Sequence, residues 1–277
     1  MKWPVLMMLA GCLIAGCSPP PDYWKKGQTE YAAQDFLGCI LALNQLLEQQ
    51  PESDSVLVLR ANCYNRIEKH EKAEKDLKRA IQINPSALGA KLGYAQLLAY
   101  RGDTTEALKL LVLPPALNSG RTVSALWLER AKLLFYAKHT SESLQCLNQA
   151  IEADGSNPEA WFLRGAFYAS DLTDSALYFK PHQAVNDYLR AIALRPSFAE
   201  AYFKLAMTEL DEFSDIEAGM SHLNDAIQFD PYNEAYYLER ARRFNAQGAR
   251  SAAIRDFKKV LQLNPLDSTA NAEVTSR

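Results

Sequence analysis

Apolar residues recur along the chain at spacings of three and four positions, in blocks that end at a proline. Such blocks end at Pro51, Pro85, Pro196, Pro231 and Pro265. The spacing is that of one face of an α-helix, and polar residues occupy the positions between. Because proline cannot continue a helix, each block predicts a helix that stops just before its proline. The pattern therefore predicts an all-α chain built from amphipathic helices.

The blocks repeat with a period close to 34 residues. Pro51 and Pro85 are 34 residues apart, as are Pro231 and Pro265. The interval from Pro85 to Pro196 holds three periods with extra residues at Pro114–Pro115 and in an insertion near 170–181. The insertion carries an apolar cluster, Leu177–Phe179, which is expected either to pack onto the array or to form a binding edge. Seven units follow, at 20–53, 54–87, 88–123, 124–157, 158–198, 199–233 and 234–267.

Within each unit, small and aromatic residues occupy fixed places. Trp161, Gly165 and Tyr168 mark a first helix, while Ala253 and Phe257 mark a second one. This arrangement resembles the tetratricopeptide repeat family. The resemblance implies a right-handed superhelical solenoid of about seven helix-turn-helix repeats over residues 22–267, with a concave groove.

The residues after the last repeat, 268–277, are expected to form a short tail that is not long enough for a capping helix. Ile254, Phe257 and Leu261 would then stay partly exposed, which suggests a homodimer through the C-terminal repeat.

The first residues of the chain predict where the protein is located in the cell. Met1–Gly16 has a lysine followed by an apolar run that is too short to span a bilayer and is typical of a signal peptide. Leu13–Cys17 resembles a bacterial lipobox, which implies that Cys17 carries the lipid and that residues 17–21 are a proline-rich tether. An ordinary signal peptide or an uncleaved anchor are the alternatives. The expected location is the bacterial outer membrane, facing the periplasm.

Arginine and aspartate vary together between the units. Arg60, Arg130, Arg164 and Arg240 precede the small residue of their first helices, where the family usually has leucine. Three of these units carry an aspartate in the second helix, whereas the unit with Arg130 has Cys146 there. Since a guanidinium that is partly buried needs a carboxylate partner, three structural ion pairs are predicted. They are Arg60 with Asp76, Arg164 with Asp187, and Arg240 with Asp256.

Composition and motifs argue against chemistry at a catalytic site. The formal net charge of −3 gives no electrostatic footprint for nucleic acid. The four histidines fall in different units, and no zinc-binding, phosphate-binding or nucleophile motif follows the leader. We therefore expect no enzyme, no cofactor and no metal. Cys39 and Cys63 could form a bridge or simply pack as small apolar residues.

In the family that the chain resembles, one face of the first helices lines the ligand groove. That surface would bind a protein or peptide partner, and the chain would act as a lipid-anchored interaction scaffold. The alternative is a carbohydrate- or peptidoglycan-binding module that uses exposed rings. The groove candidates are Trp24, Gln28, Tyr31, Asn62, Asn65, Arg66, Gln96, Tyr100, Leu128, Lys132, Phe135, Tyr136, Phe162, Phe203, Met207, Leu238 and Arg242.

Overall fold

The computed structural model describes residues 22–113, 119–170 and 178–275, and this part of the chain contains helices and no strand. The all-α prediction is therefore confirmed. The predicted leader, Cys17 and the tether lie outside the described residues, as does most of the insertion. The fifteen described helices are α1 (Tyr23–Ala32), α2 (Phe36–Gln49), α3 (Asp54–Arg66), α4 (His70–Ile83), α5 (Leu88–Arg101), α6 (Thr104–Leu110), α7 (Arg121–Tyr136), α8 (Thr140–Ala153), α9 (Pro158–Tyr168), α10 (Pro181–Leu194), α11 (Ala199–Glu212), α12 (Ile216–Phe229), α13 (Glu234–Ala246), α14 (Arg250–Leu263) and α15 (Ser268–Thr275).

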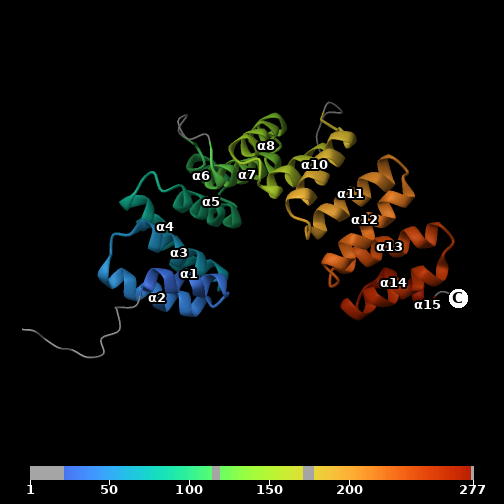
Figure 1. Cartoon of the computed structure of the whole chain (residues 1–277), viewed down its shortest axis with the longest axis horizontal. Helices are drawn as coiled ribbons and strands as arrows, with labels where there is room; N and C mark the ends of the chain where they lie inside the picture. Colours follow the sequence, from blue (N-terminus) through green and yellow to red (C-terminus); the bar gives the residue numbers. More distant parts are fainter. Residues whose placement is uncertain (1–21, 114–118, 171–177, 276–277) are drawn as a thin grey trace, which may run out of the picture. The chain divides into compact units, whose positions relative to one another are not determined.

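Consecutive helices pack against each other as hairpins (Figure 1). The pairs α1/α2, α3/α4, α9/α10, α11/α12 and α13/α14 each lie within one predicted unit, and α7/α8 begins three residues before its unit, at Arg121. The exception in length is α6, which has seven residues and ends at Leu110, just before the predicted proline interruption. Hairpins also contact their neighbours along the chain, through α2 with α3, α8 with α9, α10 with α11 and α12 with α13.

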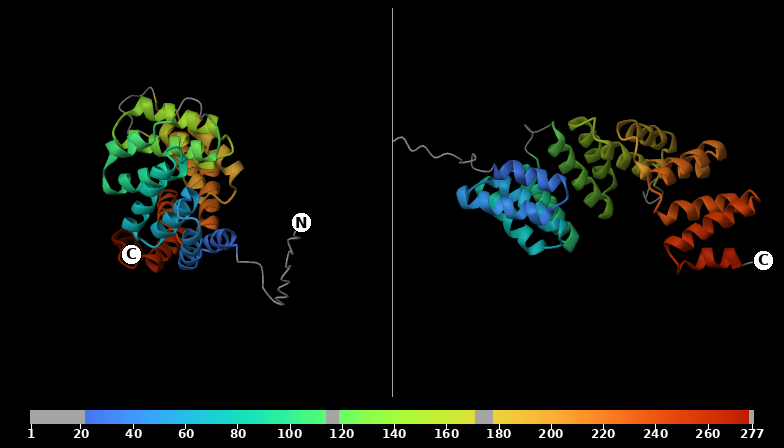
Figure 2. Two further views of the ribbon diagram at one scale, coloured as in Figure 1. Left: turned by 90° about the vertical axis from the view of Figure 1, so that its left-hand side faces the viewer. Right: turned by 60° about the horizontal axis from the view of Figure 1, so that its bottom comes forward.

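The chain divides into two compact units, one up to Leu97 and one from Leu98 onward, with the boundary inside α5. Each unit has its own buried clusters. In the first, Leu43 and Leu77 are fully buried, and in the second the same is true of Leu126, Leu205 and Leu223. Figure 2 shows the hairpins of the second unit, from α7 to α14, following one another in chain order. Serial packing of this kind lets each hairpin bury its apolar face against the next.

One residue with a positive φ angle reverses the chain in each of six turns. These residues are Gln34, Glu68, Gly102, Lys138, Ser214 and Gly248. In the α3–α4 turn the backbone N–H of Lys69 donates to the carbonyl oxygen of Tyr64 at 2.8 Å. In the α7–α8 turn the backbone N–H of His139 donates to the carbonyl oxygen of Leu134, also at 2.8 Å. These bonds satisfy carbonyl groups at the helix ends. Only two of the six residues are glycine, so the turns tolerate strain at the other four.

Small residues set the distance between the helices of a hairpin. A Cβ atom at Gly165 would lie 2.9 Å from the ring of Tyr188, and one at Gly219 would lie 2.5 Å from Leu210 Cγ. Gly219 stands where other units have Ala73, Ala184 and Ala253, and the structure explains this difference. Here α11 and α12 approach so closely that even a methyl group must displace Leu210.

The C-terminal end differs from the expectation. Residues 268–275 form α15, which packs on α14, with Ala270 fully buried. As a result Phe257 is only 2% exposed, while Ile254 and Leu261 are half-buried. The expectation was therefore wrong for Phe257, which lies in one cluster with Ala270 of α15, whereas Ile254 and Leu261 stay partly exposed as expected. The homodimer stays a prediction.

Candidate functional site

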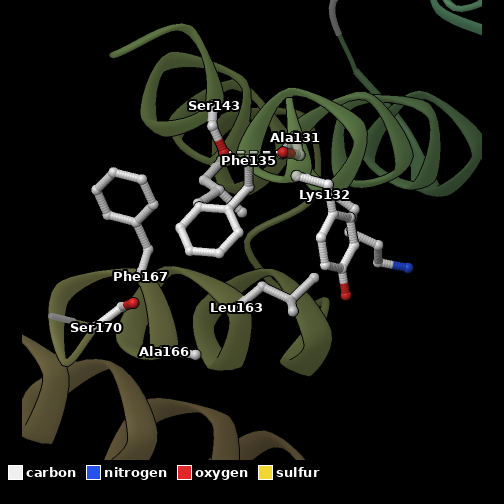
Figure 3. Close-up of a pocket in the computed structure, with 10 residues that line it drawn as sticks. Ala131, Lys132, Phe135, Ser143, Leu163, Ala166, Phe167 and Ser170 are labelled. Carbon is white, nitrogen blue, oxygen red and sulfur yellow. Dashed lines mark hydrogen bonds between the residues drawn. The ribbon is translucent and has the colours of Figure 1, made fainter. Parts of the chain in front are cut away.

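A hollow opens between α7, α8 and α9, in the second unit (Figure 3). Its volume is about 210 Å³, and apolar side chains dominate its lining. Helix α7 contributes Lys132, Phe135 and Tyr136, all of which were groove candidates. The other lining residues are Ala131, Ser143, Leu147, Leu163, Ala166, Phe167 and Ser170.

Aromatic rings from facing helices build the apolar wall of this hollow. Phe135 on α7 meets Phe167 on α9 edge to face, with ring centroids 5.9 Å apart. Tyr136 packs edge to face on Phe135, yet it is 82% exposed. An exposed ring next to a half-buried one is the arrangement of an anchor site for an apolar side chain.

The polar groups around the hollow lie at its base and its rim. The Ser143 hydroxyl donates to the Ala131 carbonyl oxygen at 2.8 Å, so it is satisfied within the protein (Figure 3). Lys132 is exposed, and its ammonium lies 3.4 Å from a carboxylate oxygen of Glu129. The hollow therefore presents an apolar interior and a cation at its edge.

A second hollow of about 310 Å³ lies between α9 and α11. Ala166 and Ser170 line both hollows, so the two are contiguous across α9. This second hollow is more polar than the first. Met207, a groove candidate, lines it together with Ala169, Tyr188, Lys204, Thr208, Asp211 and Glu212.

Tyr188 on α10 is the most deeply buried residue of the second hollow. Its ring packs under Gly165, and the side chain is fully buried. Burial raises the pKa of the Tyr188 hydroxyl above its usual value. Its oxygen has no hydrogen-bond partner among the described residues. Tyr188 therefore stays neutral at physiological pH and serves as packing for α9.

The groove candidates divide by exposure. Leu128 and Phe162 belong to the core, at 6% and 5% exposure, so their assignment to the groove was wrong. The half-buried candidates are Trp24, Tyr31, Asn62, Asn65, Phe135, Phe203, Met207 and Leu238. The exposed ones are Gln28, Arg66, Gln96, Tyr100, Lys132, Tyr136 and Arg242.

The error at Phe162 has a simple geometric cause. Its ring packs 4.8 Å from Phe198 and 6.0 Å from Tyr188, inside the contact with the next hairpin. Adjacent residues of a helix point about 100° apart, so a shift of one position exchanges the core for the surface. Leu163, which was not a candidate, lines the hollow instead.

Two other hollows contain groove candidates. In the first unit, Asn62 lines one of about 300 Å³ with Ser55, Leu59 and Gly89. In the second unit, Phe203 lines one of about 500 Å³ with Tyr236 and several polar side chains. Neither combines an exposed and a half-buried ring of one helix with a buried ring of the facing helix, as the α7–α9 hollow does. We therefore take the paired hollows on both sides of α9 as the candidate site.

The three predicted arginine–aspartate pairs are all present. Each arginine donates from Nε and Nη2 to both carboxylate oxygens, at 2.7 Å for Arg60 and Asp76. The corresponding distances are 2.8 and 2.9 Å for Arg164 with Asp187, and 2.8 Å for Arg240 with Asp256. The hydrogen bond to Asp187 raises the pKa of the Arg164 guanidinium. These pairs join the two helices of one hairpin.

An asparagine from the preceding hairpin completes each pair. The Nη1 atoms of Arg60, Arg164 and Arg240 donate to Asn44, Asn148 and Asn224 at 2.7, 2.9 and 2.7 Å. Each asparagine stands 16 residues before its arginine, a spacing that the sequence analysis did not use. We call these sets the Asn–Arg–Asp clusters. Because all three nitrogens of each guanidinium donate to protein oxygens, the clusters tie neighbouring hairpins together.

Arg130 has a different environment. Its Nη1 donates to the Leu108 carbonyl oxygen at 3.3 Å. Cys146 stands where the other units have aspartate, and burial raises the pKa of its thiol. The pairing rule therefore fails at this hairpin, as the sequence indicated.

The histidines lie in separate hairpins and have separate neighbours. His222 Nδ1 lies 2.7 Å from a carboxylate oxygen of Glu209, and His139 Nδ1 lies 3.1 Å from Glu142. Within residues 22–113, 119–170 and 178–275 no group of three potential ligands could hold a metal ion. Over the same residues, no helix is both long and apolar enough to cross a membrane.

Comparison with protein families identifies repeats in two segments. Residues 55–87 and 128–179 each match the description "Tetratricopeptide repeat". The second segment includes all the residues that line the α7–α9 hollow.

Curated relatives and solved structures agree with this result. Mouse "Tetratricopeptide repeat protein 16" is 25% identical over 87% of this chain, and the human protein of that name is 21% identical over 88%. The chain spans only 29% and 26% of their lengths.

Among solved structures, the APC/C hetero-tetramer Cut9–Hcn1 is similar with a TM-score of 0.68 at 15% identity, over 90% of this chain and 47% of that one. The C-terminal part of a TPR repeat-containing protein from Cytophaga hutchinsonii has a TM-score of 0.56 at 16% identity, over 91% of this chain and 100% of that one. These similarities concern the fold.

Proposed function

We propose that this chain, which contains tetratricopeptide repeats, is a non-enzymatic scaffold that binds an extended segment of a partner protein across the two hollows beside α9. Tetratricopeptide repeats generally serve protein interaction, and the chain has the helical hairpins of that fold. The observation that carries the proposal is the contiguity of an apolar hollow at Phe135 with a polar one at Lys204 and Asp211.

The dimensions and chemistry of the hollows define the ligand. A space of about 210 Å³ accommodates one large apolar side chain, which would contact Phe135, Leu163 and Phe167. Neighbouring residues of the same segment would cross the small side chains of Ala166 and Ser170 into the polar hollow. An apolar anchor flanked by polar contacts is typical of peptide recognition.

A photo-crosslinking experiment tests this site against a matched control. Tyr136, at the hollow, and Tyr232, away from it, are similarly exposed, at 82% and 79%. A photoreactive phenylalanine analogue at 136 should capture a partner from native membranes, whereas the analogue at 232 should not. Ala166→Glu, which places a charge between the hollows, should abolish capture at 136 while leaving the thermal midpoint close to wild type. Equal capture at both positions, or capture unaffected by Ala166→Glu, would reject the site.

Two exposed rings favour the alternative of a carbohydrate-binding module. Tyr100 and Tyr136 are 76% and 82% exposed, and sugars stack on exposed aromatic faces. Purified peptidoglycan should then sediment the wild-type protein but not Tyr136→Ala. The carbohydrate-binding alternative is excluded by two results together. Tyr136→Ala would sediment with peptidoglycan as well as the wild type does, and the separate variant with the photoreactive analogue at 136 would still capture a partner.

We also infer that the scaffold is anchored to the bacterial cell envelope through a lipid on Cys17. The inference is based on Leu13–Cys17 and on the proline-rich residues that follow. Radiolabelled palmitate should enter the wild-type protein and Cys12→Ser but not Cys17→Ser. Incorporation into Cys17→Ser would refute the anchor and leave the proposed peptide site unaffected.

A further inference from the structure

The thiols of Cys39 and Cys63 face each other across the junction of the first two hairpins. Cys39 lies on α2 and Cys63 on α3, and both side chains are fully buried. Their sulfur atoms are 2.6 Å apart. Two sulfur atoms that only pack against each other stay further apart than this, whereas helix positions that place two thiols in contact allow a covalent bond.

The same two positions at the other junctions show that packing alone does not require thiols. The repeat places Ala73 with Leu97, Ser143 with Phe167, and Ala184 with Thr208 at the equivalent sites. Ser143 and Phe167 both line the α7–α9 hollow, so these positions face each other there as well. Alanine, leucine, serine, phenylalanine and threonine occupy these sites without sulfur. The first junction alone, among these four, combines two cysteines.

We propose that Cys39 and Cys63 form a disulfide that covalently joins the first hairpin to the second. The inference goes beyond the proposed function and holds whether or not the peptide site is correct. The bond spans α2 and α3, the same helices that the hydrogen bond from Arg60 to Asn44 connects.

The oxidation balances with a disulfide oxidant of the glutathione or dithiol-oxidase class. The thiolate of one cysteine attacks the oxidant and releases one thiol, leaving a mixed disulfide. The second cysteine then displaces the oxidant's other sulfur as a thiolate. Two protein thiols thereby lose two protons and two electrons, and one oxidant disulfide becomes two thiols.

Burial determines when this reaction can occur. Both sulfurs are inaccessible in the folded protein, and burial raises the pKa of both thiols. Neither is therefore a reactive thiolate in the native state. The bond is expected to form while the first two hairpins fold, and afterwards to resist reductants until this region opens.

Peptide mapping of the full chain tests the bond directly. The unfolded, reduced protein is refolded in a mixture of glutathione and glutathione disulfide, alkylated in denaturant at acidic pH, and digested with trypsin without reductant. Trypsin separates Cys39 in residues 27–60 from Cys63 in residues 61–66. We expect these two peptides joined, two hydrogen atoms lighter than their sum. Cys146, in residues 139–164, should be alkylated and serves as the internal control.

Recovery of 27–60 and 61–66 as separate alkylated peptides from the refolded protein would overturn the proposal. So would statistical pairing of Cys39 with Cys12, Cys17 or Cys146. A second measurement tests how much the disulfide contributes to the stability of the protein. A reductant added during denaturation should lower the thermal midpoint of the wild type by roughly 5–10 °C, since the bond closes a loop of about 25 residues. The same reductant should not change the midpoint of Cys39→Ala/Cys63→Ala, while Cys146→Ser should respond as the wild type does.

Discussion

Arg60 donates two hydrogen bonds of 2.7 Å to the carboxylate of Asp76, which fixes α3 against α4. The pair is mostly buried, with side-chain exposures of 19% and 8%. Removing the carboxylate would leave the guanidinium buried beside Asn44 alone. We expect Asp76→Ala to lower the free energy of unfolding by about 2–3 kcal/mol.

The double variant Arg60→Leu/Asp76→Ala supplies the control for that prediction. The corresponding hairpin α11/α12 has Leu205 in place of arginine, fully buried. An apolar replacement of both partners should therefore restore most of the lost stability. Urea denaturation measures the free energy of unfolding of the four proteins in this double-mutant cycle, which are the wild type, Asp76→Ala, Arg60→Leu and the double variant. A double variant as unstable as Asp76→Ala would show that the pair does not account for the effect.

The left-handed turns predict a stabilising substitution. Glu68 has a φ angle of 58°, which costs free energy for any residue with a Cβ atom. Glu68→Gly should raise the free energy of unfolding by about 0.5–1 kcal/mol. Gly248→Ala, at a φ angle of 76°, should lower it by a similar amount. Changes of the same sign in both variants would contradict this account.

The close contact between Gly219 and Leu210 predicts that a larger side chain at position 219 would overpack the interface of α11 and α12. An added Cβ atom would lie 2.5 Å from Leu210 Cγ and 3.1 Å from the Ala206 carbonyl oxygen. We expect Gly219→Ala to cost about 1–3 kcal/mol in thermal or urea unfolding. The control is Gly155→Ala, whose Cβ atom would meet nothing closer than 3.6 Å and should be nearly neutral. If Gly219→Ala and Gly155→Ala changed the free energy of unfolding equally, α11 and α12 would be able to move apart without cost.

Buried tyrosine predicts a loss of stability at high pH. Burial raises the pKa of Tyr236 from 10.0 to about 12, and the side chain is only 5% exposed. Below pH 10 the phenol is neutral in both states, and its stabilising contribution is complete. As pH rises from 10 through 12 the unfolded chain ionises first, so that contribution is lost, on the order of 2 kcal/mol. Between pH 10 and 12 the free energy of unfolding of Tyr236→Phe should fall less than that of the wild type. Identical pH profiles for the two proteins would contradict the raised pKa of Tyr236.

The sequence was sufficient to predict the hairpins because their signals are local. Proline at the helix ends and small residues at fixed spacing act within one unit, as Gly165 against Tyr188 shows. The ion pair of Arg164 with Asp187 could also be predicted, since both residues vary together between units. The contribution of Asn148 was visible as a fixed spacing of 16 residues, but only once the partners were known.

The site was less predictable because it depends on which way single side chains point. Lys132, Phe135 and Tyr136 line the α7–α9 hollow, but Phe162 lies in the core, and Leu163, one position later, lines the hollow instead. The two hollows share Ala166 and Ser170, and small residues carry no signal of their own in a sequence. At the C-terminus, the short length of the tail concealed that α15 covers Phe257.

The Asn–Arg–Asp clusters make the junctions of the second unit differ in their polar contacts. Asn148 with Arg164 clamps α8 to α9, and Asn224 with Arg240 clamps α12 to α13. Between them, where α10 packs on α11, Leu189 and Leu205 stand at the positions of the asparagine and the arginine, so this junction has no such cluster. The polar hollow at Lys204 and Asp211 lies at this junction. A ligand that pushed α10 and α11 apart would therefore work against apolar packing and would leave the Asn–Arg hydrogen bonds of the two flanking junctions intact.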